Sequence, residues 1–299
     1  MKARRYEGNP ILKPKPENYW ESDNVFNPAA IYDHGLFHLL YRAMGRDGIS
    51  RIGYAVSTDG FNFFRFDKPV FTPKLILEPR GCEDPRLVKI EDRYFITYTA
   101  YSERGVRIGI ASTTNFLEWE RYKIDWPEMN NKDAVLFPEK IDDKFVMLHR
   151  PMDKEPMGIW IAYSDNLAEW YGQREIMAPL GKGTWESVKI GASVPPIKTE
   201  KGWLLIYHAV DENDVYRLGA AILCLDDPTK LLYRFPEPIL EPEMYYEIRG
   251  EVPRVVFACG ACEVKDKYYI YYGAADKVVC VATIDKEELV GEEIAISVC

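Results

Sequence analysis

Residues 81–86, Gly-Cys-Glu-Asp-Pro-Arg, place three charges beside a glycine and a proline, directly ahead of an apolar run. Pro85 restricts the residue before it to an extended backbone, so we expect the carboxylate of Asp84 to be held rigidly. Arg86 is two residues further on. In a regular strand it would share a face with Asp84, where it could orient that carboxylate or contact a ligand. A rigid carboxylate of this kind could donate a proton, and an ordinary polar turn is the alternative.

Basic side chains recur at a second kind of position. Each lies near the end of a run of aromatic and aliphatic residues: Arg42 in GLFHLLYRA, Arg150 in KFVMLHRPM and His208 in GWLLIYHAV, with Lys189 ahead of the last. Arginine offers a planar fork of donors to phosphate or carboxylate, lysine a point charge and histidine a donor near neutral pH. In a chain of net charge −9, this recurrence predicts a local anion site. Pairing of each cation with a structural carboxylate is the alternative.

One rigid acid beside a cluster of cations favours phosphorolysis of a glycosidic bond over its hydrolysis. Inverting glycosidases use two carboxyl groups, one to protonate the leaving oxygen and one to activate water. Phosphate is already an anionic nucleophile, so a phosphorolytic enzyme needs only the acid.

The chemically interesting positions recur because the chain repeats. The middle segments of five similar units span residues 35–43, 93–101, 144–152, 202–210 and 267–275. Short aromatic and β-branched runs separated by turn residues indicate an all-β protein, and units of roughly 50 residues with about four strands are typical of propeller blades. We therefore expect a five-bladed β-propeller forming a single domain over residues 1–299. A pair of β-sandwiches is the alternative, but it does not explain the shared strand order.

In a propeller the first strand of each blade lies nearest the axis, so residues at its start should meet around one funnel. In the five units these residues are Asn27, Asp84, Asp133, Ser193 and Gly260, with Asp133 offset by about two positions. We therefore expect polar side chains from distant segments to face each other and the basic cluster.

Composition excludes several classes of function. The negative net charge argues against a nucleic-acid or anionic-membrane partner. Residues 1–16 lack the apolar core of a signal peptide, and no apolar run approaches the ~20 residues needed to span a bilayer. We expect a cytoplasmic protein whose cysteines are free thiols, at positions Cys82, Cys224, Cys259, Cys262, Cys280 and Cys299. The CxxC pair at 259–262 lacks a second pair or a neighbouring histidine, so no metal site is expected.

The chain resembles glycoside hydrolase family 130, the β-mannoside phosphorylases and their hydrolytic relatives. The similarity runs from NPIL at 9–12 through VFNPAA, GCEDPR, KDAVLFPE, HRP, WESVKIGASVPPI, YHAVDE, YRLGAAILCLDDPTKLLYR and GEVPRVVFACGA to YYGAAD. Members of that family are five-bladed propellers whose phosphorylases release α-mannose 1-phosphate with inversion. The resemblance therefore implies inorganic phosphate as a co-substrate and no other cofactor.

The resemblance also implies roles for individual residues. Asp84 matches the general acid, whose proton passes through the 3-hydroxyl of the bound mannose to the glycosidic oxygen. The phosphate-binding positions match Arg150, Lys189 and His208, with Arg42 and Tyr216 bordering the phosphate. The positions that contact the transferred mannosyl unit match Asn27, Arg42, Glu251 and Asp276, and we add Arg86 and Asp133 to this sugar-binding set. No role is assigned to Cys82 or Glu83.

The retained basic residues favour a phosphorylase, since the resemblance implies that the hydrolases of this family lack them and carry additional carboxylates. Overall likeness favours β-1,2-mannobiose or β-1,2-oligomannan as substrate. The alternatives are a phosphorylase of β-1,4-mannosyl-N-acetylglucosamine or β-1,4-mannooligosaccharides, a β-mannoside hydrolase on the same scaffold, and a non-catalytic sugar-binding propeller. Because family members are often dimers or larger, we expect a homo-oligomer, with a dimer favoured.

Overall fold

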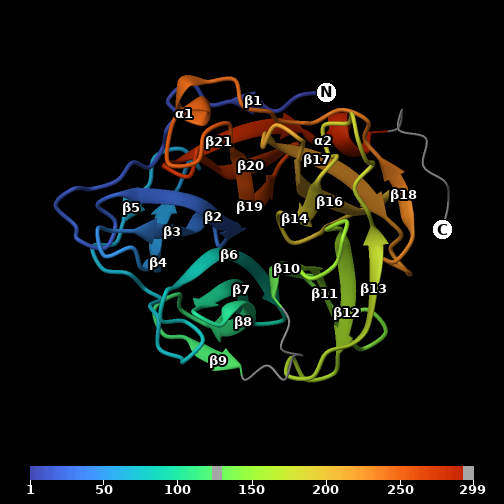
Figure 1. Cartoon of the computed structure of the whole chain (residues 1–299), viewed down its shortest axis with the longest axis horizontal. Coiled ribbons are helices and arrows are strands. Elements are labelled where there is room, and N and C mark those ends of the chain that lie inside the picture. The colour runs from blue at the N-terminus through green and yellow to red at the C-terminus, as the bar shows by residue number, and fades with distance from the viewer. Residues whose placement is uncertain (123–129, 292–299) are drawn as a thin grey trace.

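The computed structural model describes residues 1–122 and 130–291 of the chain. Strands make up nearly all of its regular structure (Figure 1). The helices in this part of the chain are two short segments, α1 (Tyr245–Ile248) and α2 (Lys286–Val290). The all-β class expected from the sequence is therefore confirmed.

Within the described residues the strands form four hydrogen-bonded sheets. The largest contains β2 (Asn24–Asp33), β3 (Leu36–Met44), β4 (Ser50–Ser57), β5 (Phe64–Arg65), β6 (Gly81–Ile90), β7 (Arg93–Ser102), β8 (Gly105–Thr113) and β9 (Glu120–Tyr122). Its two halves, β2–β5 and β6–β9, are antiparallel and are joined only by the parallel pairing of Ser50 with Gly81. The sheet therefore consists of two four-stranded groups whose strands pair at one point.

The other three sheets are also antiparallel. The second contains β10 (Asn131–Leu136), β11 (Phe145–Pro151), β12 (Ile159–Ser164) and β13 (Tyr171–Met177). The third contains β14 (Lys189–Ala192), β15 (Ile197–Thr199), β16 (Gly202–Val210), β17 (Tyr216–Leu223) and β18 (Leu231–Arg234), with both β14 and β15 paired to β16. The fourth contains β1 (Arg4–Arg5), β19 (Val256–Val264), β20 (Lys267–Ala274) and β21 (Val278–Asp285).

The strand groups surround a common centre. Figure 1 shows β2, β6, β10, β14 and β19 nearest the middle of the molecule, and β5, β9, β13, β18 and β1 toward its periphery. The first strand of each repeated unit is thus the inner one, so the starts of these strands come close together although they are far apart in sequence.

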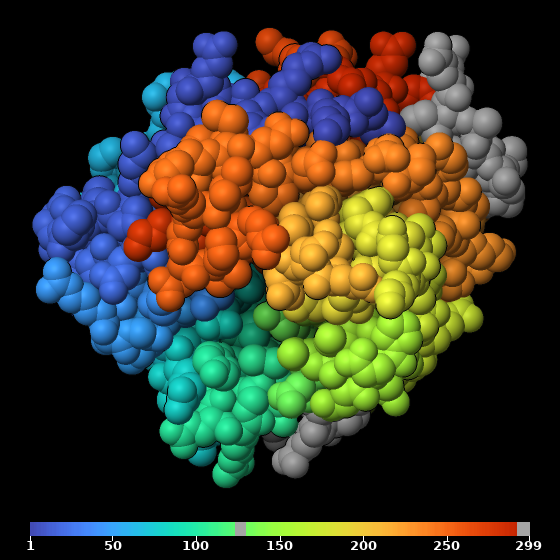
Figure 2. Space-filling model, turned by 45° about the horizontal axis from the view of Figure 1, so that its top comes forward, coloured from blue at the N-terminus to red at the C-terminus, as the bar shows by residue number. Residues whose placement is uncertain are grey.

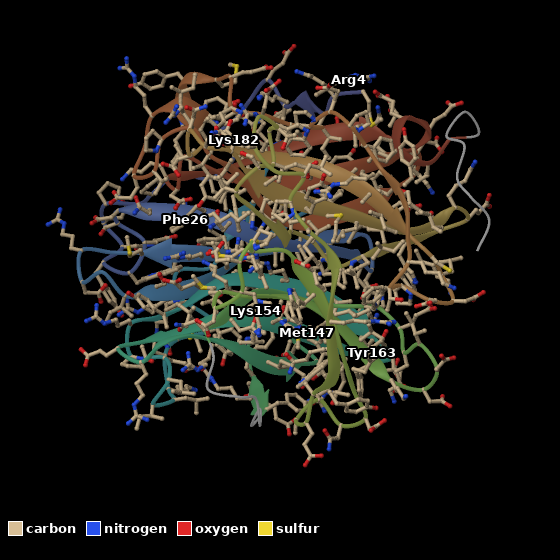
Figure 3. The ribbon with its side chains drawn as sticks, turned by 45° about the vertical axis from the view of Figure 1, so that its right-hand side comes forward. Arg4, Phe26, Met147, Lys154, Tyr163 and Lys182 are labelled. Atoms are coloured by element: carbon tan, nitrogen blue, oxygen red, sulfur yellow. The ribbon has the colours of Figure 1, made fainter. Side chains whose placement is uncertain are left out.

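The last sheet combines both ends of the described chain. Arg4 and Arg5 of β1 pair with Thr283 and Ala282 of β21, so the N-terminal segment supplies the outer strand beside the C-terminal ones. Arg4 lies at the outer margin of the molecule (Figure 3). This pairing ties the first residues to the last unit.

The hydrophobic core lies between neighbouring strand groups. One cluster joins Leu40 and Ile52 of the β2–β5 group to Leu87 and Ile96 of the β6–β9 group, and four other large clusters join the remaining neighbours in the same way. Alternate strand residues point to opposite faces, so each strand group buries both of its faces against neighbours.

A buried carboxylate recurs on the same pattern. In four units a tyrosine on the second strand donates its hydroxyl hydrogen to a fully buried glutamate, which also accepts from an arginine. The sets are Tyr41–Glu21–Arg65, Tyr98–Glu78–Arg121, Tyr207–Glu186–Arg234 and Tyr272–Glu247–Arg5. The β10–β13 unit has His149 in place of the tyrosine. The strand pattern gave no sign of these sets, because their members are up to 242 residues apart.

The cysteine expectation is only partly correct. Cys82, Cys259, Cys262 and Cys280 are buried free thiols. Cys224 is disulfide-bonded, which contradicts the prediction; sequence spacing does not reveal which cysteines meet in space. Cys299 lies outside the described residues. In the described part of the chain, no helix is both long enough and apolar enough to cross a membrane.

Candidate active site

Three inner strands are interrupted by a β-bulge at the same place. Asn27, Asp84 and Asp133 have φ angles of 45°, 48° and 55°, and the register of each strand shifts at that residue. The extended backbone predicted for Asp84 is therefore wrong, because the bulge imposes a left-handed conformation that Asn and Asp tolerate better than most residues. The three bulges also align Asp133 with the other two residues, which the sequence had offset.

The bulges lie beside a pocket of about 190 Å³. Figure 2 shows the surface hollowed near its centre, where segments coloured teal, green, yellow and orange meet. The pocket lining consists of Asn27, Arg42, Asp84, Lys132, Arg150, Met152, Lys189, His208, Tyr216, Val252, Val255, Phe257 and Asp276. Eight predicted site residues, drawn from several strand groups, are thus brought together around one cavity.

Asp84 is held by donors from the β2–β5 group. Its Oδ1 accepts from Asn27 Nδ2 at 2.8 Å and from Arg42 Nη1 at 3.1 Å, and its side chain is 4% exposed. Burial acts to raise the pKa of Asp84, but the charges of Arg42, Lys132 and Arg86 outweigh it, so the pKa is lowered.

Asp276 is a second carboxyl group on the same side of the pocket. It follows β20 with a φ of 49° and lines the cavity. Burial, together with the negative charge of Asp84, raises the pKa of Asp276 to about 6. The two carboxyl groups therefore differ in proton affinity, and a proton favours Asp276 over Asp84.

Arg150, on β11, has hydrogen-bond donors that lack a partner within the described part of the chain. Its side chain is 5% exposed, and its Nη2 forms an ion pair with Asp133 at 2.8 Å. Its Nε and Nη1 are buried and make no hydrogen bond to any described residue. Buried donors rarely stay unpaired, and the Arg150 side chain lines the pocket, so Arg150 is a candidate to bind an anionic ligand.

Three further predicted residues come from the same side. Lys189 of β14 lies with its ammonium 5.2 Å from the ring centroid of Tyr216 on β17, and both line the pocket. His208 of β16 places Nδ1 3.2 Å from Ser193 Oγ and Nε2 3.3 Å from Asp133 Oδ2. Burial lowers the pKa of His208 to about 4, so the imidazole is neutral at pH 7.

Asp133 and Arg86 are absent from the pocket lining. Asp133 is fully buried, and its carboxylate contacts Arg86 Nη2 at 3.0 Å as well as Arg150 and His208. Burial opposes the ionisation of Asp133, but the charges of Arg150 and Arg86, together with the hydrogen bond from His208, lower its pKa well below the usual value. A Cβ added to Gly191 would lie 2.7 Å from Asp133 Oδ2, so the close approach requires glycine there.

The bulge also changes where Arg86 points. Its guanidinium donates to the backbone oxygen of Asp84 at 2.9 Å rather than to the Asp84 carboxylate, and it lies 5.7 Å from the ring centroid of Phe257. The expectation that Arg86 shares a strand face with Asp84 assumed a regular strand, which the structure does not have. Direct sugar contact by Arg86 and Asp133 stays a prediction, and their observed contacts are with protein groups.

Glu251 is exposed and is not part of the pocket lining, although its neighbour Val252 is. Its role stays a prediction. Conversely, the structure adds residues that sequence reasoning missed: Lys132, Met152, Val252, Val255 and Phe257. Lys132 directly precedes Asp133, so the bulge motif could have pointed to it, whereas the apolar residues carried no distinguishing signal. Among the described residues, no group of three or more His, Cys, Asp or Glu side chains is arranged to hold a metal ion.

The chain matches a family model and characterised relatives over nearly its whole length. The family model of glycoside hydrolase family 130, described as beta-1,4-mannooligosaccharide phosphorylase, matches residues 2–292. A 1,2-beta-oligomannan phosphorylase from Thermoanaerobacter sp. (strain X514) is 50% identical, with 97% of this chain and 99% of the relative covered. A beta-1,2-mannobiose phosphorylase from the same organism is 49% identical with equal coverage.

A solved structure of a β-1,2-mannobiose phosphorylase is also similar to this chain. The beta-1,2-mannobiose phosphorylase from Listeria innocua, in complex with beta-1,2-mannobiose, superposes with a TM-score of 0.88 at 32% identity and covers 97% of this chain and 98% of that one. Similar sequence and similar fold thus extend over almost the whole chain. The chain belongs to glycoside hydrolase family 130.

Proposed function

We propose that this enzyme cleaves β-mannosides by phosphorolysis and releases α-mannose 1-phosphate with inversion. The observation that carries the proposal is the pair of unpartnered donors on Arg150, buried at the wall of a pocket that also contains Asp84. A hydrolase would need a carboxylate that activates water on the face opposite the acid, and no such anion site. The second carboxyl group of this pocket, Asp276, is on the same side as Asp84, and the other side carries Arg150 and Lys189. Inorganic phosphate is the proposed co-substrate.

The two sides of the pocket bind different substrates. Asn27, Arg42 and Asp276, which come from the β2–β5 group and the end of β20, hold the mannosyl unit beside Asp84. On the other side, phosphate is bound by Arg150 and Lys189, with Tyr216 and His208 beside them. Neutral His208 has both ring nitrogens near protein groups, so it contributes to the anion site chiefly by fixing Asp133 and its arginines.

Asp84 must carry a proton when the glycosidic bond breaks. Bound phosphate adds negative charge to the pocket, and bound sugar displaces water from it; both effects raise the pKa of a neighbouring carboxyl group. The proton then passes from Asp84 to the leaving oxygen, directly or through the 3-hydroxyl of mannose, while a phosphate oxygen attacks the anomeric carbon from the opposite face. The glycosidic C–O bond breaks as the new C–O–P bond forms.

The preferred substrate is β-1,2-mannobiose or β-1,2-oligomannan. The two Thermoanaerobacter relatives and the Listeria structure are all named for β-1,2-linked substrates, whereas the family model is described by a β-1,4 activity. The greater likeness to the individual β-1,2 enzymes favours that linkage. Acceptor tests in the synthetic direction, with mannose and with N-acetylglucosamine, would separate the two possibilities by the linkage of the product.

We also infer that the strand groups are the five blades of a single propeller domain. The arrangement of inner and outer strands around a centre (Figure 1) and the clusters joining successive neighbours support this inference. A cytoplasmic location and a homodimer remain proposals drawn from the sequence. Sedimentation analysis of the purified protein would test the dimer.

The phosphorylase proposal is tested by measuring β-1,2-mannobiose cleavage with and without inorganic phosphate. We expect turnover to require phosphate and to yield equal amounts of mannose and mannose 1-phosphate, with the α-anomer identified by NMR. Equal turnover without phosphate would establish the hydrolase alternative. Sugar binding without any turnover would establish the non-catalytic alternative.

A further inference from the structure

Glu83 precedes the proposed acid and has no place in the mechanism described so far. Adjacent residues of a regular strand point to opposite faces. The bulge at Asp84, with its φ of 48°, breaks this alternation, and both carboxylates reach the same guanidinium. Glu83 Oε1 lies 2.7 Å from Arg42 Nη2, and Asp84 Oδ1 lies 3.1 Å from Arg42 Nη1.

Arg42 is held in place by protein groups besides the two carboxylates. Its Nε donates to Ser50 Oγ at 2.9 Å, and its guanidinium carbon lies 4.5 Å from the ring centroid of Phe26. Its side chain is 15% exposed. With Glu83 on one Nη and Asp84 on the other, the fork has a single orientation, so removal of either carboxylate would leave the arginine with fewer restraints.

Glu83 itself is not part of the pocket lining. Arg42 and Asp84 line the pocket, whereas Glu83 does not and is 9% exposed. It therefore acts on any substrate only through Arg42 and Asp84. This separates it from the residues proposed to contact sugar or phosphate.

The charges around Asp84 explain why a second carboxylate is useful. Arg42 from β3, Lys132 from β10 and Arg86 from β6 all favour its ionised form, while Asp276 after β20 and Glu83 oppose it. A proton donor beside three cations would lose its proton readily. A carboxylate that shares one of those cations weakens the effect.

We propose that Glu83 is a positioning residue for the acid: it holds Arg42 in place and takes up part of its charge, so that Asp84 can carry its proton in the substrate complex. This inference rests on the proposed phosphorolytic function. The coupling is reciprocal, because burial, with a contribution from the charge of Asp84, raises the pKa of Glu83. The two neighbouring carboxyl groups thus compete for one arginine.

The test is the pH profile of kcat for phosphorolysis of β-1,2-mannobiose at saturating phosphate. The alkaline limb of this profile reports loss of the proton from the acid in the substrate complex. In Glu83→Gln the full charge of Arg42 acts on Asp84, so we expect this limb to move by about one pH unit toward acid. At pH values above the shifted limb, we expect kcat of Glu83→Gln to be roughly 10-fold lower than kcat of the wild type at the same pH. At lower pH the two kcat values should converge.

Two variants complete the design. Glu83→Asp keeps the negative charge, so its alkaline limb should stay near the wild-type position even where kcat is lower. Glu91→Gln removes an exposed carboxylate from the turn of the same β6–β7 hairpin and should leave the whole profile unchanged. Circular dichroism establishes that each variant is folded.

The proposal would be overturned if the alkaline limb of Glu83→Gln stayed at its wild-type pH, or if this variant lost kcat equally at every pH. Glu83 would then be a purely structural residue. A shifted limb in Glu83→Asp would likewise overturn the charge argument. Failure of the proposed function is a separate outcome, because it appears in the wild-type enzyme as turnover without phosphate.

Discussion

The unpartnered donors of Arg150 give the sharpest prediction about phosphate. We expect Arg150→Lys to lose most of the apparent affinity for phosphate while keeping the positive charge beside Asp133. Lysine is a compact ammonium that cannot reproduce a planar fork of donors. Its charge still compensates the buried Asp133 carboxylate, which avoids the larger destabilisation caused by leaving a buried charge alone.

The magnitude follows from the number of hydrogen bonds lost. Arg150 has two unpaired buried donors, Nε and Nη1, and the lysine can replace about one of them. A hydrogen bond to a charged group contributes about 1.5–3 kcal/mol. Losing one therefore lowers kcat/KM for phosphate by about 10- to 100-fold, since 1.4 kcal/mol corresponds to a tenfold change.

The assay measures initial rates of β-1,2-mannobiose phosphorolysis. Phosphate is varied at saturating mannobiose, and mannobiose is then varied at saturating phosphate. The KM for mannobiose should change less than the KM for phosphate. Arg93→Lys is the matched control, because Arg93 is an exposed arginine at the start of β7 that pairs with Glu120. A folded Arg150→Lys enzyme with wild-type kcat/KM for phosphate would refute the placement of phosphate on Arg150.

Three further predictions concern the carboxyl groups. Asp84→Asn should lower kcat by about 10²–10⁴-fold yet spare much of the activity on a nitrophenyl β-mannoside, whose leaving group needs no proton; equal losses on both substrates would contradict its role as the acid. Because the pKa of Asp276 is raised to about 6, the ionisation of this one group lowers the stability of the native state as pH rises from about 4 to 6. Asp276→Asn should therefore stabilise the fold by about 2 kcal/mol at pH 7.5 and little at pH 4, and equal unfolding midpoints of variant and wild type at pH 7.5 would contradict this. Tyr98→Phe removes a donor from buried Glu78 and should lower the free energy of unfolding by about 1–3 kcal/mol in urea titrations; an unchanged midpoint would show that Arg121 and the backbone donors suffice.

The fold class could be predicted because it depends on local pattern. Alternating aromatic and β-branched residues specify strands wherever they occur, and the repetition of these runs indicates a repeating β architecture. The same repetition located Asn27, Asp84, Arg42, Arg150 and His208 at equivalent positions, and all five line the pocket. In this respect a short-range signal was sufficient to find much of the site.

The contacts inside the site depended on tertiary structure. Asp133 was assigned to the sugar, but it lies behind the pocket and joins Arg86, Arg150 and His208. Arg150 lies on β11, which pairs with the strand of Asp133. Arg86 and His208 are 47 and 75 residues away in the chain and belong to other sheets, so only the packing of separate sheets brings these two to Asp133. Pattern within one unit carries no information about which atoms of other units are within 3 Å.

The sequence by itself determined which residue types occupy the inner strand ends, because that choice is written in each repeated unit. Only the tertiary structure decided what those residues do to each other. The backbone at Asp84 is left-handed rather than extended, and that one conformational difference turns Glu83 and Asp84 toward a single arginine. A bulge is a property of two paired strands, so a single strand's residues could not have revealed it.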